Sequence, residues 1–223
     1  YLFIYLFIYL LAPLYGDVTW GAGGTTSDLT LDLTTGLVRD HGMVGNMHLT
    51  CTNMEKTKVD AALAGAKAAG IRNIVALRGD PPVGETKWEA VEGGFACALD
   101  LVKYIRGAYG DYFGISVAGY PEGHPNVIKP VEAGHTLSAA EKQRVVDTPE
   151  GPMVCSDADY ANELAYLKQK VDAGADFIIT QMFFDTEVFR YFVDQCRAIG
   201  INCPVVPGIM LLQVLGRKTK RTE

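Results

Sequence analysis

The stretch AAGIRNIVAL (residues 68–77) contains the end of a helical pattern, a glycine and the start of a buried strand. The same order recurs in DAGADFIITQ (residues 172–181) and AIGINCPVV (residues 198–206). In each stretch the glycine can take the left-handed conformation that ends a helix, and an apolar run follows within a few residues. Strands and helices are therefore expected to alternate, which is typical of a parallel sheet with helical crossovers.

The other elements follow from the same periodicities. Six short apolar or β-branched runs are expected to be strands, at residues 17–20, 46–51, 73–78, 114–120, 176–184 and 203–209. Four helical patterns lie between them, at residues 55–69, 93–106, 160–173 and 186–199. The polar insertion at residues 126–162 is expected to be a mobile, lineage-specific excursion near the mouth of the fold, because loops of this length are uncommon unless functional or disordered.

Two architectures can hold such a sheet. An open dinucleotide-binding sheet needs a G-x-G-x-x-G loop, and GAGGTT (residues 21–26) has Thr26 where the third glycine should be. A closed barrel places its active site at the C-terminal ends of the strands, and here every expected strand ends in polar or otherwise unusual residues. The sequence therefore predicts an α/β fold, an incomplete (β/α)8 TIM barrel with two of eight strands unseen.

Composition limits the classes of function. The 223 residues are 48% hydrophobic and 21% charged, which is ordinary for one globular domain. The net charge of −6 argues against a nucleic-acid partner. An odd number of cysteines and no CxxC pair indicate reduced thiols in a cytoplasmic protein, with no disulfide framework and no metal site; the cysteines are Cys51, Cys97, Cys155, Cys196 and Cys203.

The two ends differ from the rest. Residues 1–12 are wholly apolar but too short to span a bilayer, and they lack the features of a signal peptide, so no membrane association is expected. Residues 211–223 form a tail rich in basic residues that is expected to be solvated. Between them, residues 13–210 are expected to form the barrel.

The run NIVALRGDPP (residues 73–82) turns abruptly from apolar to charged. Arg-Gly-Asp could be an adhesion signal in a secreted protein, whereas charges at the end of a buried strand would form a ligand site. The cysteine usage weakens the first interpretation, because an adhesion signal needs an extracellular protein.

Six motifs, in this order, resemble the methylenetetrahydrofolate reductase family in its eukaryotic-type catalytic domain: DVTWGAGG, HLTC, NIVALRGDPP, SVAGYPEGHP, LKQKVDAGADFIITQMFFD and CPVVPGI. The resemblance implies a flavin-bearing (β/α)8 barrel of which strands two to seven are recognisable. It also implies hydride transfer from NAD(P)H through FAD to the substrate 5,10-methylenetetrahydrofolate, giving 5-methyltetrahydrofolate. A homo-oligomer is compatible with it.

The resemblance also assigns roles to residues. Lining of FAD is implied for Thr19, Trp20, His48, Arg78, Gly79, Asp80, Ala98, Tyr120, His124 and Lys170. Arg78 and Lys170 suit a pyrophosphate, because both carry positive charge. Asp80 is the candidate catalytic residue, whose carboxylate would stabilise the iminium cation formed when the methylene bridge of the folate opens, and Gln181 would bind the folate ring.

Simpler interpretations stay open. His48 could be a hydrogen-bonded core histidine, and Asp80 could cap a helix. Two positions depart from the family, which often has tyrosine at Cys97 and aspartate at Glu163. The chain could also be another flavin or nicotinamide reductase on the same barrel, or a non-catalytic remnant that binds FAD.

The family's first strand carries a general-acid glutamate, and residues 1–12 contain no carboxylate. The resemblance therefore implies little or no reductase activity for this polypeptide unless another acid, such as Glu122, replaces that glutamate.

Overall fold

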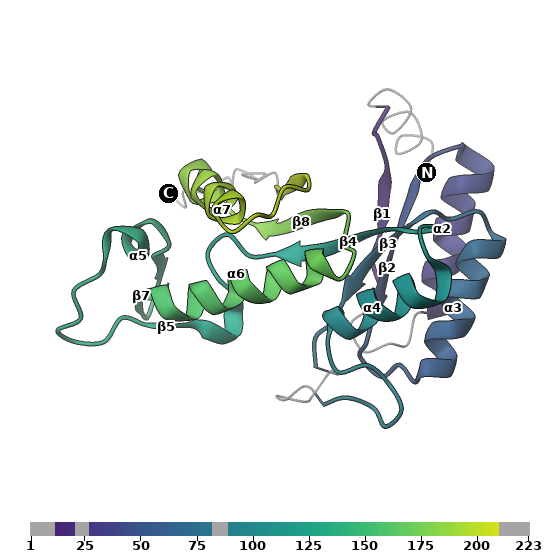
Figure 1. Cartoon of the computed structure of the whole chain (residues 1–223). Helices are drawn as coiled ribbons and strands as arrows, with labels where there is room; N and C mark the ends of the chain where they lie inside the picture. Colours follow the sequence, from purple (N-terminus) through teal and green to yellow (C-terminus); the bar gives the residue numbers. More distant parts are fainter. Residues whose placement is uncertain (1–11, 21–26, 82–88, 210–223) are drawn as a thin grey trace, which may run out of the picture.

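The computed structural model describes residues 12–20, 27–81 and 89–209 (Figure 1). Its main feature is a parallel sheet of six strands in the order β1-β2-β3-β4-β8-β9. The strands are β1 (Gly16–Val18), β2 (Gly45–Thr50), β3 (Asn73–Leu77), β4 (Gly114–Gly119), β8 (Phe177–Met182) and β9 (Val205–Gly208). All six correspond to the runs expected from the sequence, and their parallel order confirms the incomplete barrel as the fold class.

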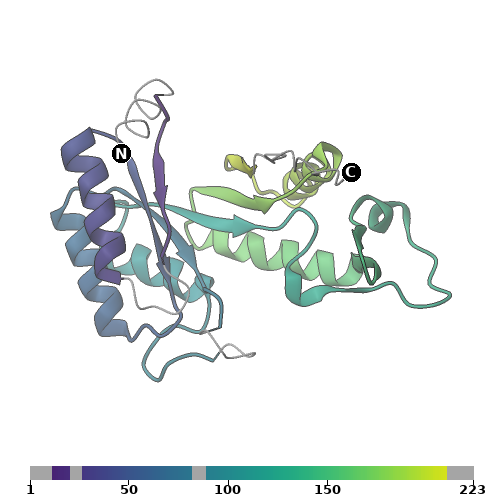
Figure 2. The ribbon, with the colours of Figure 1, turned by 180° about the vertical axis from the view of Figure 1, so that it is seen from behind.

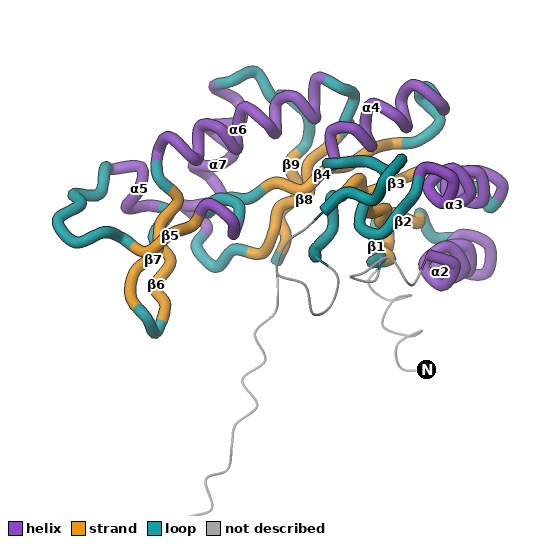
Figure 3. Tube along the Cα trace, turned by 90° about the horizontal axis from the view of Figure 1, so that it is seen from below, coloured by secondary structure: helices purple, strands orange, loops and turns teal. Residues whose placement is uncertain are grey.

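Helices connect successive strands and lie on the outer side of the curved sheet (Figures 1 and 3). They are α2 (Ser27–His41), α3 (Lys56–Ala68), α4 (Ala98–Tyr109), α6 (Asp157–Asp172) and α7 (Thr186–Ala198). The three expected stop glycines, Gly70, Gly174 and Gly200, have φ values of 81°, 116° and 81°. The helix, glycine and strand repeat is thus confirmed at the level of the backbone.

Helix α2 was not expected from the sequence. Its buried side includes Thr30 and Thr34, which are 2% and 0% exposed, and the Thr34 hydroxyl donates to the Thr30 carbonyl. Leu29 and Leu33 are exposed instead. A search for an apolar stripe fails here because threonines occupy the buried face.

The core lies between the sheet and its helices. Alternate residues of the strands point outward into this layer, as a strand's period of two requires. Met47 and Leu49 of β2, and Ile115 and Val117 of β4, are completely buried in it. The helices contribute Val59, Leu63, Leu101, Ile105, Leu164 and Leu167. The opposite, concave side of the sheet carries the alternate strand residues, among them His48, Thr50 and Ser116.

The insertion between β4 and α6, which was expected to be a polar loop, has regular secondary structure. Its segment contains a 3-10 helix at Pro125–Val127, a three-stranded antiparallel sheet in the order β5-β7-β6 and one short α-helix. The elements are β5 (Ile128–Pro130), α5 (Ala139–Gln143), β6 (Val146–Thr148) and β7 (Gly151–Cys155). They project from the start of α6, far from α2 and α3 (Figures 1 and 2).

Some expectations fall on segments outside the described residues. These are the apolar run and the basic tail at the two ends, and the loop GAGGTT (residues 21–26). Within the described ranges, no helix is both long enough and apolar enough to cross a membrane.

Arg106 of α4 joins several elements at the N-terminal ends of β4 and β8. Its Nε donates to the Gly174 carbonyl at 2.8 Å and its Nη1 to the Phe113 carbonyl at 2.6 Å. Its Nη2 pairs with Asp176, whose carboxylate also accepts from the Ile115 amide at 2.7 Å. One side chain therefore holds the starts of two neighbouring strands and the end of α6.

We expect Arg106→Met to lower the free energy of unfolding by about 2–4 kcal/mol, because several hydrogen bonds to a charged donor are lost together. Urea denaturation checks this. Arg190→Met is the control, since among the described residues Arg190 pairs only with Glu187 on the exposed side of α7. A loss for Arg106→Met no larger than that of the control would contradict the role assigned to Arg106.

Candidate functional site

A cavity of about 1180 Å³ opens at the C-terminal ends of β3, β4 and β8. Part of its wall comes from the segments that follow β3 and β4, within residues 78–81 and 120–128, and from Gln181 near the end of β8. The last residues of β3 and β4, the start of α4, one face of α6 and Phe192 of α7 also line it. Its place at the C-terminal ends of the strands is where barrel enzymes carry their active sites.

Two buried threonines, Thr50 and Thr52, hold the turn after β3 through hydrogen bonds to its carbonyl groups. Thr50 Oγ1 donates to the Arg78 carbonyl at 2.8 Å, and Thr52 Oγ1 lies 3.1 Å from the same carbonyl and 3.0 Å from that of Asp80. Gly79 has φ +88°, and a Cβ there would lie 2.0 Å from Thr50 Oγ1. Glycine at this position is therefore required by the threonines, whether or not a ligand is bound.

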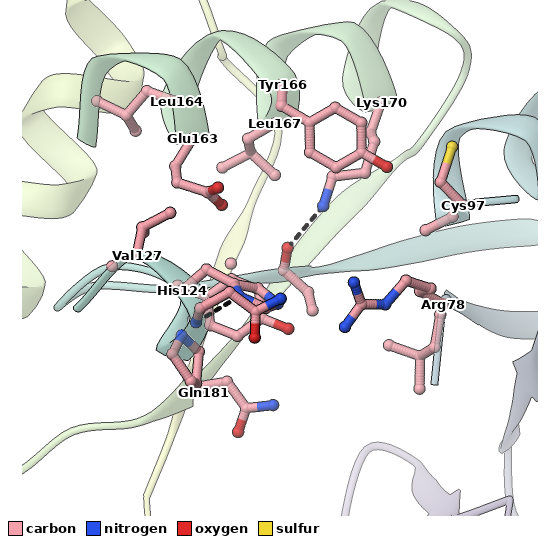
Figure 4. A pocket seen from close by; sticks show the side chains of 18 of the residues that line it. Arg78, Cys97, His124, Val127, Glu163, Leu164, Tyr166, Leu167, Lys170 and Gln181 are labelled. Atoms are coloured by element: carbon pink, nitrogen blue, oxygen red, sulfur yellow. Dashed lines mark hydrogen bonds between the residues drawn. The ribbon is translucent and has the colours of Figure 1, made fainter. Parts of the chain in front are cut away.

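Two cationic side chains point into the cavity, Arg78 from the end of β3 and Lys170 from α6 (Figure 4). Lys170 is 5% exposed, and its Nζ donates to the Ala118 carbonyl at 3.0 Å. Burial lowers the pKa of Lys170 to about 8, although Glu163 acts in the opposite direction. Because Arg78 points into the cavity, the geometry favours a ligand site over an adhesion signal for Arg-Gly-Asp.

His124 and Tyr120 form the wall that follows β4. Their rings are 4.6 Å apart between centroids. The amide of Asn126 donates to His124 Nδ1 at 3.1 Å, so in the neutral ring the proton lies on Nε2. Burial, with the charges of Arg78 and Lys170, lowers the pKa of His124. His124 is therefore set as a neutral hydrogen-bond donor at pH 7.

Three carboxylates also line the cavity. Asp80 is exposed, whereas Glu122 and Glu163 are half-buried. Burial raises the pKa of Glu122, and the charge of Asp185 adds to this. Burial also raises the pKa of Glu163, against the opposing charges of Lys170 and Arg78. The cavity thus combines positive charge with two acids, Glu122 and Glu163, whose pKa is raised.

The cavity brings together most of the predicted site residues: Arg78, Gly79, Asp80, Ala98, Tyr120, His124, Lys170 and Gln181. Thr19, Trp20 and His48 lie outside its lining. Trp20 is 8% exposed, and its Nε1 has no hydrogen-bond partner among the described residues. His48 Nε2 lies 3.4 Å from Asp17 Oδ1 on β1. Contact of these three residues with a cofactor stays a prediction.

Sequence reasoning gave no site role to Tyr160 and Tyr166 of α6, which also line the cavity. Helical spacing could have found them, because Tyr160, Glu163, Tyr166 and Lys170 recur every three or four residues on one helix face. The supporting role of Thr52 has no such local signal.

Comparison with known proteins identifies the chain. The family model described as methylenetetrahydrofolate reductase matches residues 8–223. The chain belongs to the methylenetetrahydrofolate reductase family. Methylenetetrahydrofolate reductase (NADH) 1 of Zea mays is 54% identical over 198 residues, and methylenetetrahydrofolate reductase 1 of Schizosaccharomyces pombe is 46% identical over 211 residues. The alignments cover 89% and 95% of this chain, but only 30% of the length of each family relative.

A solved structure of a putative lyase/mutase from Burkholderia cenocepacia aligns with a TM-score of 0.47 and 17% identity, covering 84% of this chain and 54% of that one.

The buried amine of Lys170 predicts a dependence of stability on pH. The pKa of about 8 in the folded chain lies below the 10.5 of a free lysine, so between these pH values the unfolded state binds more protons. The free energy of unfolding should therefore rise with pH across this window. The free energy of unfolding of the wild type, minus that of Lys170→Met, should increase by about 2 kcal/mol from pH 7 to pH 10.

Urea denaturation at pH 7, 8, 9 and 10 measures this difference. The pH dependence that comes from all other titratable groups is the same in both proteins and cancels. A difference that stays constant with pH would show that Lys170 is not held as a buried charge.

Proposed function

We propose that the chain is the flavin-binding part of a methylenetetrahydrofolate reductase, an oxidoreductase that reduces 5,10-methylenetetrahydrofolate to 5-methyltetrahydrofolate with NAD(P)H, in one-carbon metabolism and the methyl supply for methionine. The observation that carries the proposal is the joint presence of Arg78, Asp80, Tyr120, His124, Lys170 and Gln181 around one cavity. Family membership supports the reaction class.

The residues present fit FAD. Drug-sized ligands occupy pockets of roughly 300–1,000 Å³, and the cavity of about 1180 Å³ has room for a larger one. Arg78 and Lys170 supply positive charge for a pyrophosphate, and an anion beside Lys170 would raise the pKa of its amine again. When bound, FAD would accept a hydride from the nicotinamide and deliver it to the folate.

The chain's own residues have separate tasks in this reaction. Asp80 is an exposed residue of the cavity lining, and its carboxylate would stabilise the folate iminium cation that forms when the methylene bridge opens. Gln181 follows Thr180 near the end of β8, where its amide can both donate to and accept from the pterin ring. His124 can donate from Nε2, and Tyr120 offers a ring face for stacking.

NADH is favoured as the electron donor, because the maize relative is a methylenetetrahydrofolate reductase (NADH) by name. The five cysteines are all unpaired, which suits a cytoplasmic protein. A homo-oligomer stays compatible with the proposal. The barrel is assigned to residues 13–210, with the segments before and after it as separate parts.

Flavin binding is the first test. We expect the purified chain to take up FAD noncovalently, and Arg78→Met to weaken this binding about 10- to 100-fold, because charge-assisted hydrogen bonds are worth ~1.5–3 kcal/mol. Quenching of flavin fluorescence on titration measures the affinity, and Arg190→Met serves as the control for loss of an exposed arginine. Folded wild-type chain that takes up no FAD would refute the proposal.

Asp80→Asn tests the catalytic assignment. The amide keeps the shape of the carboxylate but not its charge, so flavin affinity should change little while hydride transfer to folate slows about a hundredfold, since one such electrostatic contact is worth ~3 kcal/mol. The rate at which methylenetetrahydrofolate reoxidises the photoreduced protein measures the effect. Asp194→Asn, on the exposed side of α7, is the matched control.

If reoxidation by folate is equally fast in Asp80→Asn and wild type, Asp80 is not the catalytic carboxylate. Reduced flavin that folate does not reoxidise, but another acceptor does, would instead indicate a different reductase. Bound flavin without any turnover would indicate a binding remnant.

A further inference from the structure

The insertion places a charged side chain in an apolar setting. Arg144, which follows α5, has a side chain with 0% exposed surface. Its Nη2 donates to the Cys155 carbonyl at 3.3 Å and to Asp157 Oδ1 at 2.5 Å. Within the described parts of the chain, its Nε and Nη1 have no hydrogen-bond partner. Burying a guanidinium this incompletely paired is costly, so another interaction must offset part of the cost.

Stacking on Tyr160 is that interaction. The Cζ atom of Arg144 lies 4.1 Å from the ring centroid of Tyr160 on α6. Cation–π contacts are worth about 2 kcal/mol or more when they are desolvated, and arginine stacks on aromatic faces better than lysine does. Tyr160 is itself 4% exposed, which satisfies the condition of desolvation.

Tyr160 links this contact to the cavity. It lines the cavity, and its hydroxyl donates to the Pro121 carbonyl at 3.2 Å. Pro121 lies between Tyr120 and Glu122, which both line the cavity as well. Arg144 is therefore separated from the wall of the cavity by one aromatic ring.

A second contact joins the insertion to the same wall. Gly123 has φ +105°, and a Cβ there would lie 2.6 Å from Cys155 Cβ and 2.8 Å from its Sγ. Cys155 ends β7, and its register partner is Ile128, the last residue of the wall. Strand β7 thus contacts the wall at its centre and pairs with its end.

Helix α5 fixes the position of Arg144. The Glu141 carboxylate is buried and accepts from the amides of Ser138 at 2.9 Å and Asp157 at 3.3 Å. It also contacts His135 Nε2 at 3.0 Å. The amide of Arg144 donates to the Glu141 carbonyl at 2.9 Å. The start of α6 and the end of α5 are thereby held together.

We propose that Arg144 is a positioning residue, and that residues 129–155 of the insertion form a brace that fixes the cavity wall formed by residues 120–128. Through Tyr160 and Cys155 it holds the backbone that presents Tyr120 and His124 to the ligand. The bracing is a property of the protein alone. Its consequence for cofactor affinity rests on the proposed function.

Hydrogen exchange tests the brace without any ligand. The reporters are the amides of Gly123 and Val127, which donate to the carbonyls of Tyr120 and His124 at 3.1 and 2.9 Å. In Arg144→Met the thioether can still pack on Tyr160. The side chain of Asp157 is 51% exposed, so water can replace Arg144 as its hydrogen-bond partner at little cost. We expect both amides to exchange about tenfold faster, equivalent to ~1.4 kcal/mol.

Three further variants sharpen this measurement. Tyr160→Phe removes only the hydroxyl, and should accelerate exchange at Gly123 about fivefold, in line with one hydrogen bond of ~1 kcal/mol. Lys142→Met, on the exposed side of α5, changes a charge of the insertion without touching Arg144 and should leave both amides unchanged. Arg144→Lys keeps the charge but loses the planar stack, and should lie between Arg144→Met and wild type.

Flavin titration of the same variants tests the consequence. FAD affinity should fall about tenfold in Arg144→Met, and the absorption spectrum of the bound flavin should shift because Tyr120 and His124 are less fixed. If both amides exchange in folded Arg144→Met and Tyr160→Phe at the same rate as in Lys142→Met, the brace is overturned. Failure of the wild type to bind FAD would refute the proposed function and leave the exchange result to decide the brace.

Discussion

In-register parallel pairing of β3, β4 and β8 is the constraint on which the cavity depends. Ala76 pairs with Val117, and Gly119 with Thr180. Continuing the register one residue past β4 sets Tyr120 opposite Gln181 of β8, and Arg78 directly follows β3 at the same edge of the sheet. A slip of one residue would move every inward side chain to the helix-covered face. The chemistry of the site is therefore fixed by the hydrophobic layer on the other side of the sheet.

Much of this arrangement can be predicted from the sequence, because its signals are local. Gly70, Gly174 and Gly200 mark where helices stop, and a buried run after each one marks a strand. Parallel strands point their C-terminal ends the same way, so residues directly after strands, such as Arg78 and Tyr120, had to come near each other. The identity of the ligand came from the family resemblance and not from these patterns.

Other features depend on contacts that no local pattern shows. Arg106 meets Asp176 seventy residues further along the chain, and Arg144 meets Tyr160 only after the insertion has folded back. Helix α2 escapes a search for apolar periodicity because Thr30 and Thr34 are buried on its inner side. The insertion reads as a polar loop because its short strands are only partly buried. In each case the sequence allows several partners and the tertiary structure selects one.

The ion-paired hub around Arg106 and the ligand cavity occupy opposite ends of the same strands. Contributions to stability from residues that share no partners are nearly additive. Substitutions at the cavity end can therefore accumulate without disturbing the anchorage at the other end. The residues that line the cavity, and with them the ligand that the barrel binds, can therefore evolve while the contacts of Arg106 keep the sheet stable.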